Sequence, residues 1–504
     1  MSKRMHFFRS GMLLVLVGLA IRTVSMFFGA FISRTVGAEG TGLYTLVMTV
    51  YSFAVTFSTS GIGLTVTRLV ASAIGEGDDG GVDRVIRSAL IYSLFFGSIA
   101  TLVMYFGADM LALGVLNDER TATALRVLAL SLIPTALSAV YTGYFVGVKR
   151  VGFNATLVVF CQLLKTLLTV ALVISLLPQG TVSAVVGLCI GLTVTEFLGF
   201  ILILIGYFYD RRKHRIKADK SKSAMMSVSK MALPLALSAY IRSFLLNVEH
   251  ILIPKKLRES GESASEAYAH YGTLHGMALP LIIFPMTPLS SFSGLLVPEF
   301  AEDMAGGRSE RMSRVASAAL NATLSYAVFC AVYIYFFAEE LGYAVYGSYD
   351  AGFYISTLSF VIPIMYLDHV TDSVLKGIGE HVFSMWVNIS DSLLSVILVW
   401  FLIPRMGIMG YAVVIVVMEG YNFLLSFLRL KGKINFCLTP IKTVIAPIFS
   451  AGIGVYASKI IFRFGGSATP PLWLVLKMLF GICVSAFVLS MINLVVKKRQ
   501  KIKV

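Results

Sequence analysis

Residues 182–208 read VSAVVGLCIGLTVTEFLGFILILIGYF and contain a single charged side chain, that of Glu196. About 20 apolar residues are enough for a helix to cross a hydrocarbon core of ~30 Å. The apolar residues are continuous and do not alternate with polar ones, which favours a helix over a strand of a membrane barrel. The stretch therefore predicts a transmembrane helix.

Similar apolar runs recur along the chain and predict an all-α polytopic membrane protein. Of the 504 residues, 57% are hydrophobic and 14% are charged, whereas about 25% are charged in an average soluble protein. Too few polar residues remain to cover a soluble globule, and the hydrophobicity excludes a disordered chain. Fourteen spans are predicted, at residues 8–32, 42–66, 85–107, 122–147, 153–177, 182–208, 229–253, 270–297, 315–337, 352–375, 382–403, 408–430, 441–462 and 471–496.

The net charge of +15 mainly indicates how the chain is oriented. If the N-terminus is cytoplasmic, most of the 42 lysine and arginine residues fall on the cytoplasmic side, including those at 211–222 and 497–503. The loop at 338–350 has three acids and no lysine or arginine. Because positive residues favour the cytoplasmic side, both termini are predicted to be cytoplasmic.

The basic loops predict contact with anionic membrane lipids. They are dispersed and carry no nucleic-acid-binding motif, so nucleic acid is not a predicted partner. The five cysteines are widely spaced without a CxxC pair. Neither a metal site nor a cofactor is predicted from them.

Weak internal matches indicate two related halves. The segment IRT at 21–23 in span one resembles IRS at 241–243 in span seven, and GLY at 42–44 resembles GTL at 272–274. Both halves begin on the cytoplasmic side, so the repeat is parallel. The predicted organisation is a six-helix lobe at 1–210, a basic linker at 211–228, a second six-helix lobe at 229–432, and two further helices with a basic tail at 433–504.

Four motifs carry a resemblance to a known family: GAEGTGLY at 37–44, ALPLALSAYIR at 232–242, GMALPLIIFP at 276–285 and LVPEF at 296–300. Over essentially its whole length the chain resembles the stage V sporulation protein B group. That group belongs to the multidrug/oligosaccharidyl-lipid/polysaccharide exporter superfamily and is related to lipid II flippases. The resemblance implies two lobes in a V-shaped arrangement around a central cavity, which opens inward and outward in turn. It also implies a monomer in the bacterial cytoplasmic membrane, with a part in polysaccharide, peptidoglycan or spore formation.

Two arginines are the first candidates for substrate contact. Arg22 lies near the middle of span one and Arg242 near the middle of span seven. A charge at mid-bilayer costs ~2.5–3.5 kcal/mol on insertion scales and is usually functional. In the implied architecture both face one cavity, where guanidinium groups suit the oxygens of a diphosphate. The alternative is that each arginine pairs with an acid such as Glu249 or Glu196 and only joins helices.

Other charged residues in the spans have secondary roles in this prediction. Arg68, at the end of span two, is predicted to be interfacial or supporting. Asp368 and Asp372 lie four residues apart on one face of span ten and are candidates for binding Na⁺ or relaying protons. An ion pair between helices is the alternative for these acids.

Span eight contains Pro280, Pro285 and Pro288. Each proline removes a backbone donor and kinks the helix. The carbonyl groups that are freed at membrane depth are tolerated only against protein or a wet cavity. Span eight is therefore predicted to line the transport path and to bend.

The predicted function is a flippase that moves a lipid-linked, diphosphate-bearing oligosaccharide or peptidoglycan precursor from the inner to the outer leaflet. The main alternative is a multidrug exporter of the same superfamily, coupled to Na⁺ or H⁺. Such an exporter of organic cations would favour an acidic cavity, whereas Arg22 and Arg242 make this one cationic. A glycosyltransferase is disfavoured because no nucleotide or metal motif appears, so the chain is not predicted to be an enzyme. A sporulation factor without transport is the remaining alternative.

Overall fold

The structure is a computed structural model that describes residues 2–59, 61–76, 78–148, 150–213, 223–439, 441–462 and 471–502. Within these residues every regular element is a helix and no strand occurs. This confirms the all-α class. Residues 214–222 of the predicted basic linker and the side chains of the basic tail lie outside the described residues.

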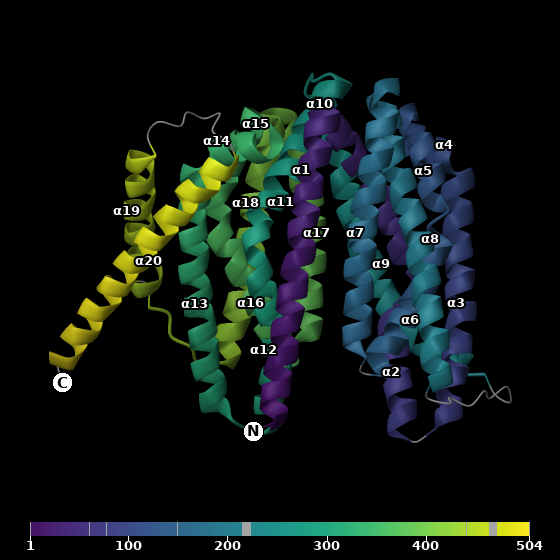
Figure 1. Ribbon diagram of the computed structural model, residues 1–504, viewed down its shortest axis with the longest axis horizontal. Coiled ribbons are helices and arrows are strands. Elements are labelled where there is room, and N and C mark those ends of the chain that lie inside the picture. Colours follow the sequence, from purple (N-terminus) through teal and green to yellow (C-terminus); the bar gives the residue numbers. More distant parts are fainter. Residues whose placement is uncertain are drawn as a thin grey trace. The chain divides into compact units, whose positions relative to one another are not determined.

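The chain forms two compact units, which are described separately. The middle unit consists of residues 38–268, and the terminal unit consists of residues 1–37 and 269–504. Long helices run side by side within each unit (Figure 1). These units differ from the predicted lobes, because residues 1–37 join the C-terminal residues and the seventh predicted span joins the middle unit.

The middle unit contains the part of α1 (Ser2–Thr59) that follows Gly37. Its other elements are α2 (Ile62–Gly75), α3 (Asp79–Phe106), α4 (Ala108–Met110), η1 (Leu111–Leu116), η2 (Glu119–Thr121), α5 (Ala122–Ala129), α6 (Leu132–Gly147), α7 (Val151–Leu176), η3 (Leu177–Gln179), α8 (Thr181–Lys213), α9 (Met225–Glu259) and the start of α10 (Ala264–Tyr271).

The terminal unit contains α1 up to Gly37 and the end of α10. Its other elements are η4 (Gly272–Ala278), α11 (Leu279–Ile283), η5 (Phe284–Met286), α12 (Thr287–Ala305), α13 (Ser309–Phe336), α14 (Ala338–Leu341), η6 (Gly342–Tyr346), α15 (Tyr349–Leu358), η7 (Ser359–Val361), α16 (Ile362–Gly377), α17 (His381–Met406), α18 (Ile408–Lys433), η8 (Ile441–Ile445), α19 (Ala446–Ile461) and α20 (Pro471–Ile502).

The number of membrane spans differs from the prediction. Twelve helical segments of the described chain are long and apolar enough to cross a membrane, or thirteen if α5 and α6, bent by 42°, form one broken span. The predicted span at 42–66 and the second half of the one at 8–32 fall within one helical stretch, Ala20–Gly75. The protein is a multi-pass membrane protein, but the count of fourteen is not confirmed.

Gly37 divides α1 at the boundary between the two units. Its φ of 72° and ψ of −177° interrupt the helix, and this backbone conformation is essentially restricted to glycine. Three residues earlier, Arg34 donates hydrogen bonds to the carbonyl groups of Tyr343, Ala344 and Val345 at the end of η6. Because helix C-termini carry partial negative charge, these bonds attach the first part of α1 to the terminal unit.

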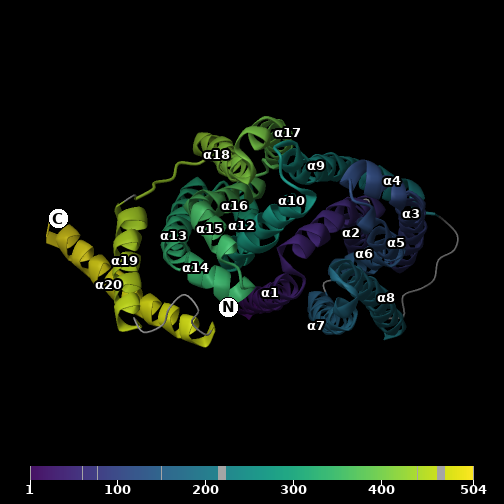
Figure 2. The same cartoon turned by 90° about the horizontal axis from the view of Figure 1, so that it is seen from above.

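The two C-terminal helices pack on the rest of the terminal unit. In both views α20 crosses α19 obliquely (Figures 1 and 2). A Cβ on Gly454 would lie 2.3 Å from the carbonyl oxygen of Gly481, so only glycine allows this close crossing. The Tyr333 hydroxyl lies 2.8 Å from Ser485 Oγ, and Lys477 pairs with Glu340 at 3.0 Å. These contacts join α20 to α13 and α14.

Buried acids hold basic residues at the helix ends of each unit. In the middle unit, Asp83 pairs with Arg87 at 3.0 Å and with Arg211 at 2.6 Å. In the terminal unit, Asp303 pairs with Arg308 at 2.9 Å and with Arg311 at 3.1 Å. Much of the basic charge near the helix ends is therefore held in structural ion pairs.

The predicted span eight is broken into short pieces at its prolines. Pro280, Pro285 and Pro288 each lie at the first or second position of a new piece, α11, η5 and α12. The Tyr366 hydroxyl donates to the Ile282 carbonyl at 2.8 Å, and the Tyr326 hydroxyl donates to the Pro285 carbonyl at 2.8 Å. Tyrosines of α16 and α13 thus satisfy carbonyl groups of the broken helix, as the proline pattern requires.

We expect Tyr366→Phe to destabilise the protein by about 1–2 kcal/mol, because the substitution leaves the Ile282 carbonyl unsatisfied. Both the Tyr366 side chain and its hydrogen bond are buried. The measurement is thermal unfolding in detergent, with Tyr456→Phe on the exposed side of α19 as the control. Equal unfolding midpoints for the two variants would contradict this role of the hydroxyl group.

Candidate functional site

In the middle unit, Arg242 lies at the centre of a long helix. It is 17 residues from each end of α9, or about 25 Å at 1.5 Å per residue. The Tyr240 hydroxyl donates to the Phe57 carbonyl at 3.2 Å, and the Ser243 hydroxyl lies 3.4 Å from Thr56 Oγ1. These residues turn one face of α9 toward α1. The Arg242 side chain is exposed on another face.

In the terminal unit, Arg22 has a comparable environment. It precedes Arg34, the residue bound to η6, by twelve residues, or about 18 Å of helix. Its side chain is exposed, whereas Ala30 and Ile32 further along the helix are buried. Arg22 is therefore too deep along the span to reach the end of the helix with its own side chain.

Neither arginine forms an ion pair with a described residue. Two other described cations within the spans do have acidic neighbours: Lys165 interacts with Glu196, and Lys477 pairs with Glu340. Guanidinium groups at membrane depth without an acid partner are costly unless a wet or anionic environment solvates them. Arg22 and Arg242 are thus available to an anion that enters from outside each unit.

The acids proposed as alternative partners have other neighbours. Glu196 on α8 accepts a hydrogen bond from Thr135 at 3.3 Å and interacts with Lys165. Glu249 is buried on α9, about two helical turns beyond Arg242. Arg68 lies exposed in the middle of α2, seven residues before its end at Gly75. Of the residues predicted to support the arginines, none among those described is paired with Arg22 or Arg242.

The acids of the terminal unit gather on three neighbouring helices. Asp368 and Asp372 on α16 interact with each other, and Asp368 also interacts with Asp391 on α17 and Glu419 on α18. Asp372 pairs with Lys376 at 2.5 Å, whereas one oxygen of Asp368 is buried without a hydrogen-bond partner. The predicted pair on span ten is therefore part of a group of four carboxyl groups.

Asp391 and Glu419 lie in other helices of this group, and the sequence does not connect them with Asp368. The connection depends on how α16, α17 and α18 pack, and no spacing along the chain shows it. Within the part of the chain that the structure describes, no three histidine, cysteine, aspartate or glutamate residues are close enough to hold a metal ion. No three of the four carboxyl groups therefore lie close enough together to share a metal ion.

Comparison with protein families identifies a match over more than half of the chain. The model described as "Polysaccharide biosynthesis protein" matches residues 7–304. Among curated relatives, stage V sporulation protein B of Bacillus subtilis (strain 168) is 25% identical over 417 residues, which cover 81% of this chain and 80% of the relative. Lipid II flippase MurJ of the same organism is 21% identical over 465 residues, covering 85% and 83%. These matches confirm the resemblance predicted from the four motifs.

Solved structures share the fold. The lipid II flippase MurJ in an inward closed conformation has a TM-score of 0.73 at 13% identity and covers 95% of this chain and 98% of that one. An inward-facing multidrug resistance MATE family transporter of the MOP superfamily has a TM-score of 0.66 at 17% identity, covering 83% and 98%. At such identities the likeness concerns the fold alone, and it supports the predicted exporter architecture.

Proposed function

This chain belongs to the polysaccharide biosynthesis protein family, and on that premise we propose that it is a flippase for a lipid-linked glycan. Its curated relatives include a lipid II flippase and a sporulation protein. The proposed substrate is an oligosaccharide or peptidoglycan precursor joined to its lipid by a diphosphate. The protein carries it from the inner to the outer leaflet of a bacterial plasma membrane by alternating access, as a monomer with both termini cytoplasmic.

One observation supports the anionic substrate above all others: the exposed, mid-span Arg22 and Arg242 have no acid partner among the described residues. A diphosphate presents several oxygens to which guanidinium groups donate bidentate, charge-assisted hydrogen bonds. Moving such a headgroup through hydrocarbon without protein is prohibitively costly. Arginines along a hydrated path lower that cost while the lipid tail stays in the bilayer.

The broken eighth span supplies the moving part of the proposal. Pro280, Pro285 and Pro288 each occupy the second position of one of its pieces, and the carbonyl groups of Ile282 and Pro285 accept hydrogen bonds from tyrosine side chains. A helix assembled in this way changes its bend by exchanging side-chain bonds, with few backbone bonds lost. We place these prolines along the transport path.

Reconstitution tests the function directly. The purified protein is placed in vesicles with a fluorescent precursor that carries a disaccharide on a polyprenyl diphosphate, and an impermeant reductant quenches label in the outer leaflet. We expect the protected fraction of label to become accessible with protein and to stay protected without it. An excess of unlabelled precursor is expected to slow this exposure, whereas a lipophilic organic cation is expected to have no effect. Competition by the organic cation alone would favour the exporter.

The exporter is retained as a second candidate because of the carboxyl groups of the terminal unit. Asp368, Asp391 and Glu419 interact at membrane depth, and acids so placed commonly relay protons or bind cations. In the flippase proposal, Asp368 and Asp372 bind a coupling cation that drives the return step. In the exporter, the same acids exchange that cation for a drug.

A further inference from the structure

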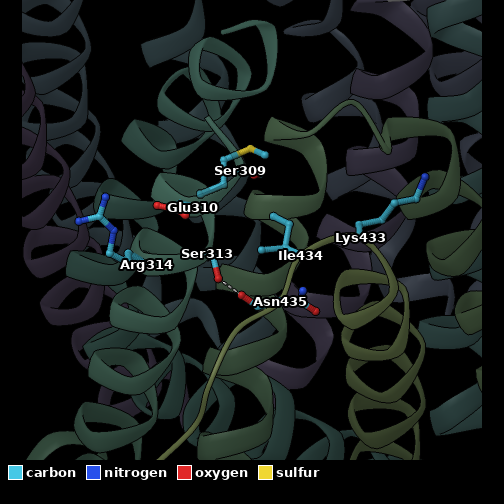
Figure 3. A pocket seen from close by; sticks show the side chains of 8 residues that line it. Ser309, Glu310, Ser313, Arg314, Lys433, Ile434 and Asn435 are labelled. Carbon is cyan, nitrogen blue, oxygen red and sulfur yellow. Dashed lines mark hydrogen bonds between the residues drawn. The ribbon is translucent and has the colours of Figure 1, made fainter. Parts of the chain in front are cut away.

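A polar cavity lies at one end of the terminal unit, between the start of α13 and the end of α18 (Figure 3). Its volume of about 440 Å³ is within the range of small-ligand sites. Both helices are candidate membrane spans that end here, so the cavity lies at the level of lipid headgroups. Its lining consists of Ser309, Glu310, Met312, Ser313, Arg314, Lys433, Ile434 and Asn435.

The wall that follows α18 is an extended segment held in place by α13. Ser313 donates to the carbonyl group of Asn435, and Ser317 accepts from the Cys437 backbone at 3.0 Å. One turn further, Asn321 donates to the Cys437 carbonyl at 2.7 Å and accepts from the Thr439 backbone at 2.9 Å. Ser313, Ser317 and Asn321, which lie one turn apart on α13, thus satisfy backbone groups of this extended segment. They hold the segment in place as a wall of the cavity.

Some charged groups of the cavity already form ion pairs and others do not. Lys433 pairs with Glu380 at 2.7 Å, and Arg429 pairs with the same carboxylate at 2.8 Å. The hydrogen bonds from Lys433 and Arg429 hold the pKa of Glu380 below its usual value, so this pairing persists at neutral pH. Among the described residues, Arg314 and Glu310 have neither an ion pair nor a hydrogen-bond partner. The cavity therefore offers one positive and one negative group.

We propose that this cavity binds the headgroup of an aminophospholipid, with its phosphate at Arg314 and its primary ammonium group at Glu310. The two side chains lie four residues apart on α13, and both line the cavity. A lipid headgroup with a phosphate and a primary ammonium group carries the two charges that complement these side chains. The Ser309 hydroxyl and the Asn435 amide are further hydrogen-bond donors to the phosphate.

Other inner-leaflet lipids fit this charge pattern less well. A lipid with an anionic head and no amine would bring its negative charge beside the Glu310 carboxylate. A choline head keeps the positive charge, but its methyl groups cannot donate a hydrogen bond to Glu310. The preference for a primary amine over choline therefore depends on Glu310, and affinity for the phosphate depends on Arg314.

Native mass spectrometry of the full-length protein tests the site, with phosphatidylethanolamine, phosphatidylcholine and phosphatidylglycerol of identical acyl chains. We expect the wild type to retain phosphatidylethanolamine about tenfold more tightly than phosphatidylcholine, the factor of one charge-assisted hydrogen bond. Glu310→Gln is expected to abolish this preference. Arg314→Gln is expected to weaken both lipids about equally.

Lys431→Gln is the matched control, because Lys431 is exposed on the last turn of α18 but does not line the cavity. It is expected to leave the lipid preference unchanged, and equal unfolding midpoints establish that the variants are folded. Retention of the preference in Glu310→Gln, or tighter binding of phosphatidylglycerol by the wild type, overturns the proposal. Displacement of the lipid by an equal concentration of soluble phosphoethanolamine would assign the cavity to a free solute instead.

Discussion

Flipping of a fluorescent diphosphate-linked precursor by the Arg242→Ala protein is expected to be slower than wild type by roughly 30-fold or more. Arg242 lies exposed at the centre of α9 and has no acid partner among the described residues. A hydrogen bond to a charged group contributes about 1.5–3 kcal/mol, and each 1.36 kcal/mol changes a rate tenfold. Loss of one such contact at about 2 kcal/mol therefore accounts for the expected factor.

Arg22→Ala is expected to behave in the same way, since Arg22 is also exposed and unpaired at mid-span. The matched control is Arg68→Ala, which removes another exposed arginine, in the middle of the short helix α2. Arg68 is only seven residues, or about 10 Å of helix, from the end of α2, so its long side chain can extend toward the membrane surface. Its loss is therefore expected to change flipping less than twofold, the scale of a surface charge change. Equal slowing in all three variants would indicate a general effect of positive charge.

Lysine at the same positions separates charge from geometry. A lysine keeps the positive charge but cannot form the two parallel hydrogen bonds of a guanidinium group. Arg242→Lys is therefore expected to recover part of the lost rate. Undiminished flipping in both alanine variants, at equal folding and equal reconstitution, would remove the anion site from the proposal.

Much of the fold followed from the apolar runs, because a membrane permits few structures other than continuous helices. Pro280, Pro285 and Pro288 each occupy the second position of a helical piece, α11, η5 and α12, and their bending of the span stays a prediction. The division into compact units at residues 38–268 and at 1–37 with 269–504 does not follow from the apolar runs. Within each unit, the helices are joined by contacts between residues distant in the sequence, such as Arg34 with η6 and Tyr240 with α1. The pattern of apolar runs does not predict such contacts.

The candidate site was predictable only in part. The cost of a mid-bilayer charge identifies Arg22 and Arg242 from their positions alone. Their lack of an acid partner could not be predicted, because Glu196 turns out to lie near Lys165 and Thr135. In the same way, Asp368 acquires Asp391 and Glu419 as neighbours only when α16, α17 and α18 pack together.

A membrane potential is expected to shift the distribution of precursor between the leaflets more strongly than any single substitution. Carrying one charge across 100 mV changes the free energy by about 2.3 kcal/mol, so a diphosphate with two charges contributes about 4.6 kcal/mol. At 1.4 kcal/mol per tenfold, this corresponds to roughly a 2,000-fold change in the leaflet ratio. A potassium gradient with an ionophore imposes the potential, negative on the side of the basic loops, and the reductant assay measures the ratio.

The same experiment tests whether the acids couple flipping to a cation. If the potential alone drives the substrate, Asp368→Asn and Asp372→Asn should leave the potential-dependent ratio unchanged. If one cation enters for each precursor that leaves, three charges move in each cycle, and the ratio should depend on the potential about 1.5 times as steeply on a logarithmic scale. In that case the two substitutions should remove the additional dependence. If the leaflet ratio of the wild type does not change with the potential, the substrate does not cross the membrane as an uncompensated anion. The two arginines would then bind a headgroup without net charge.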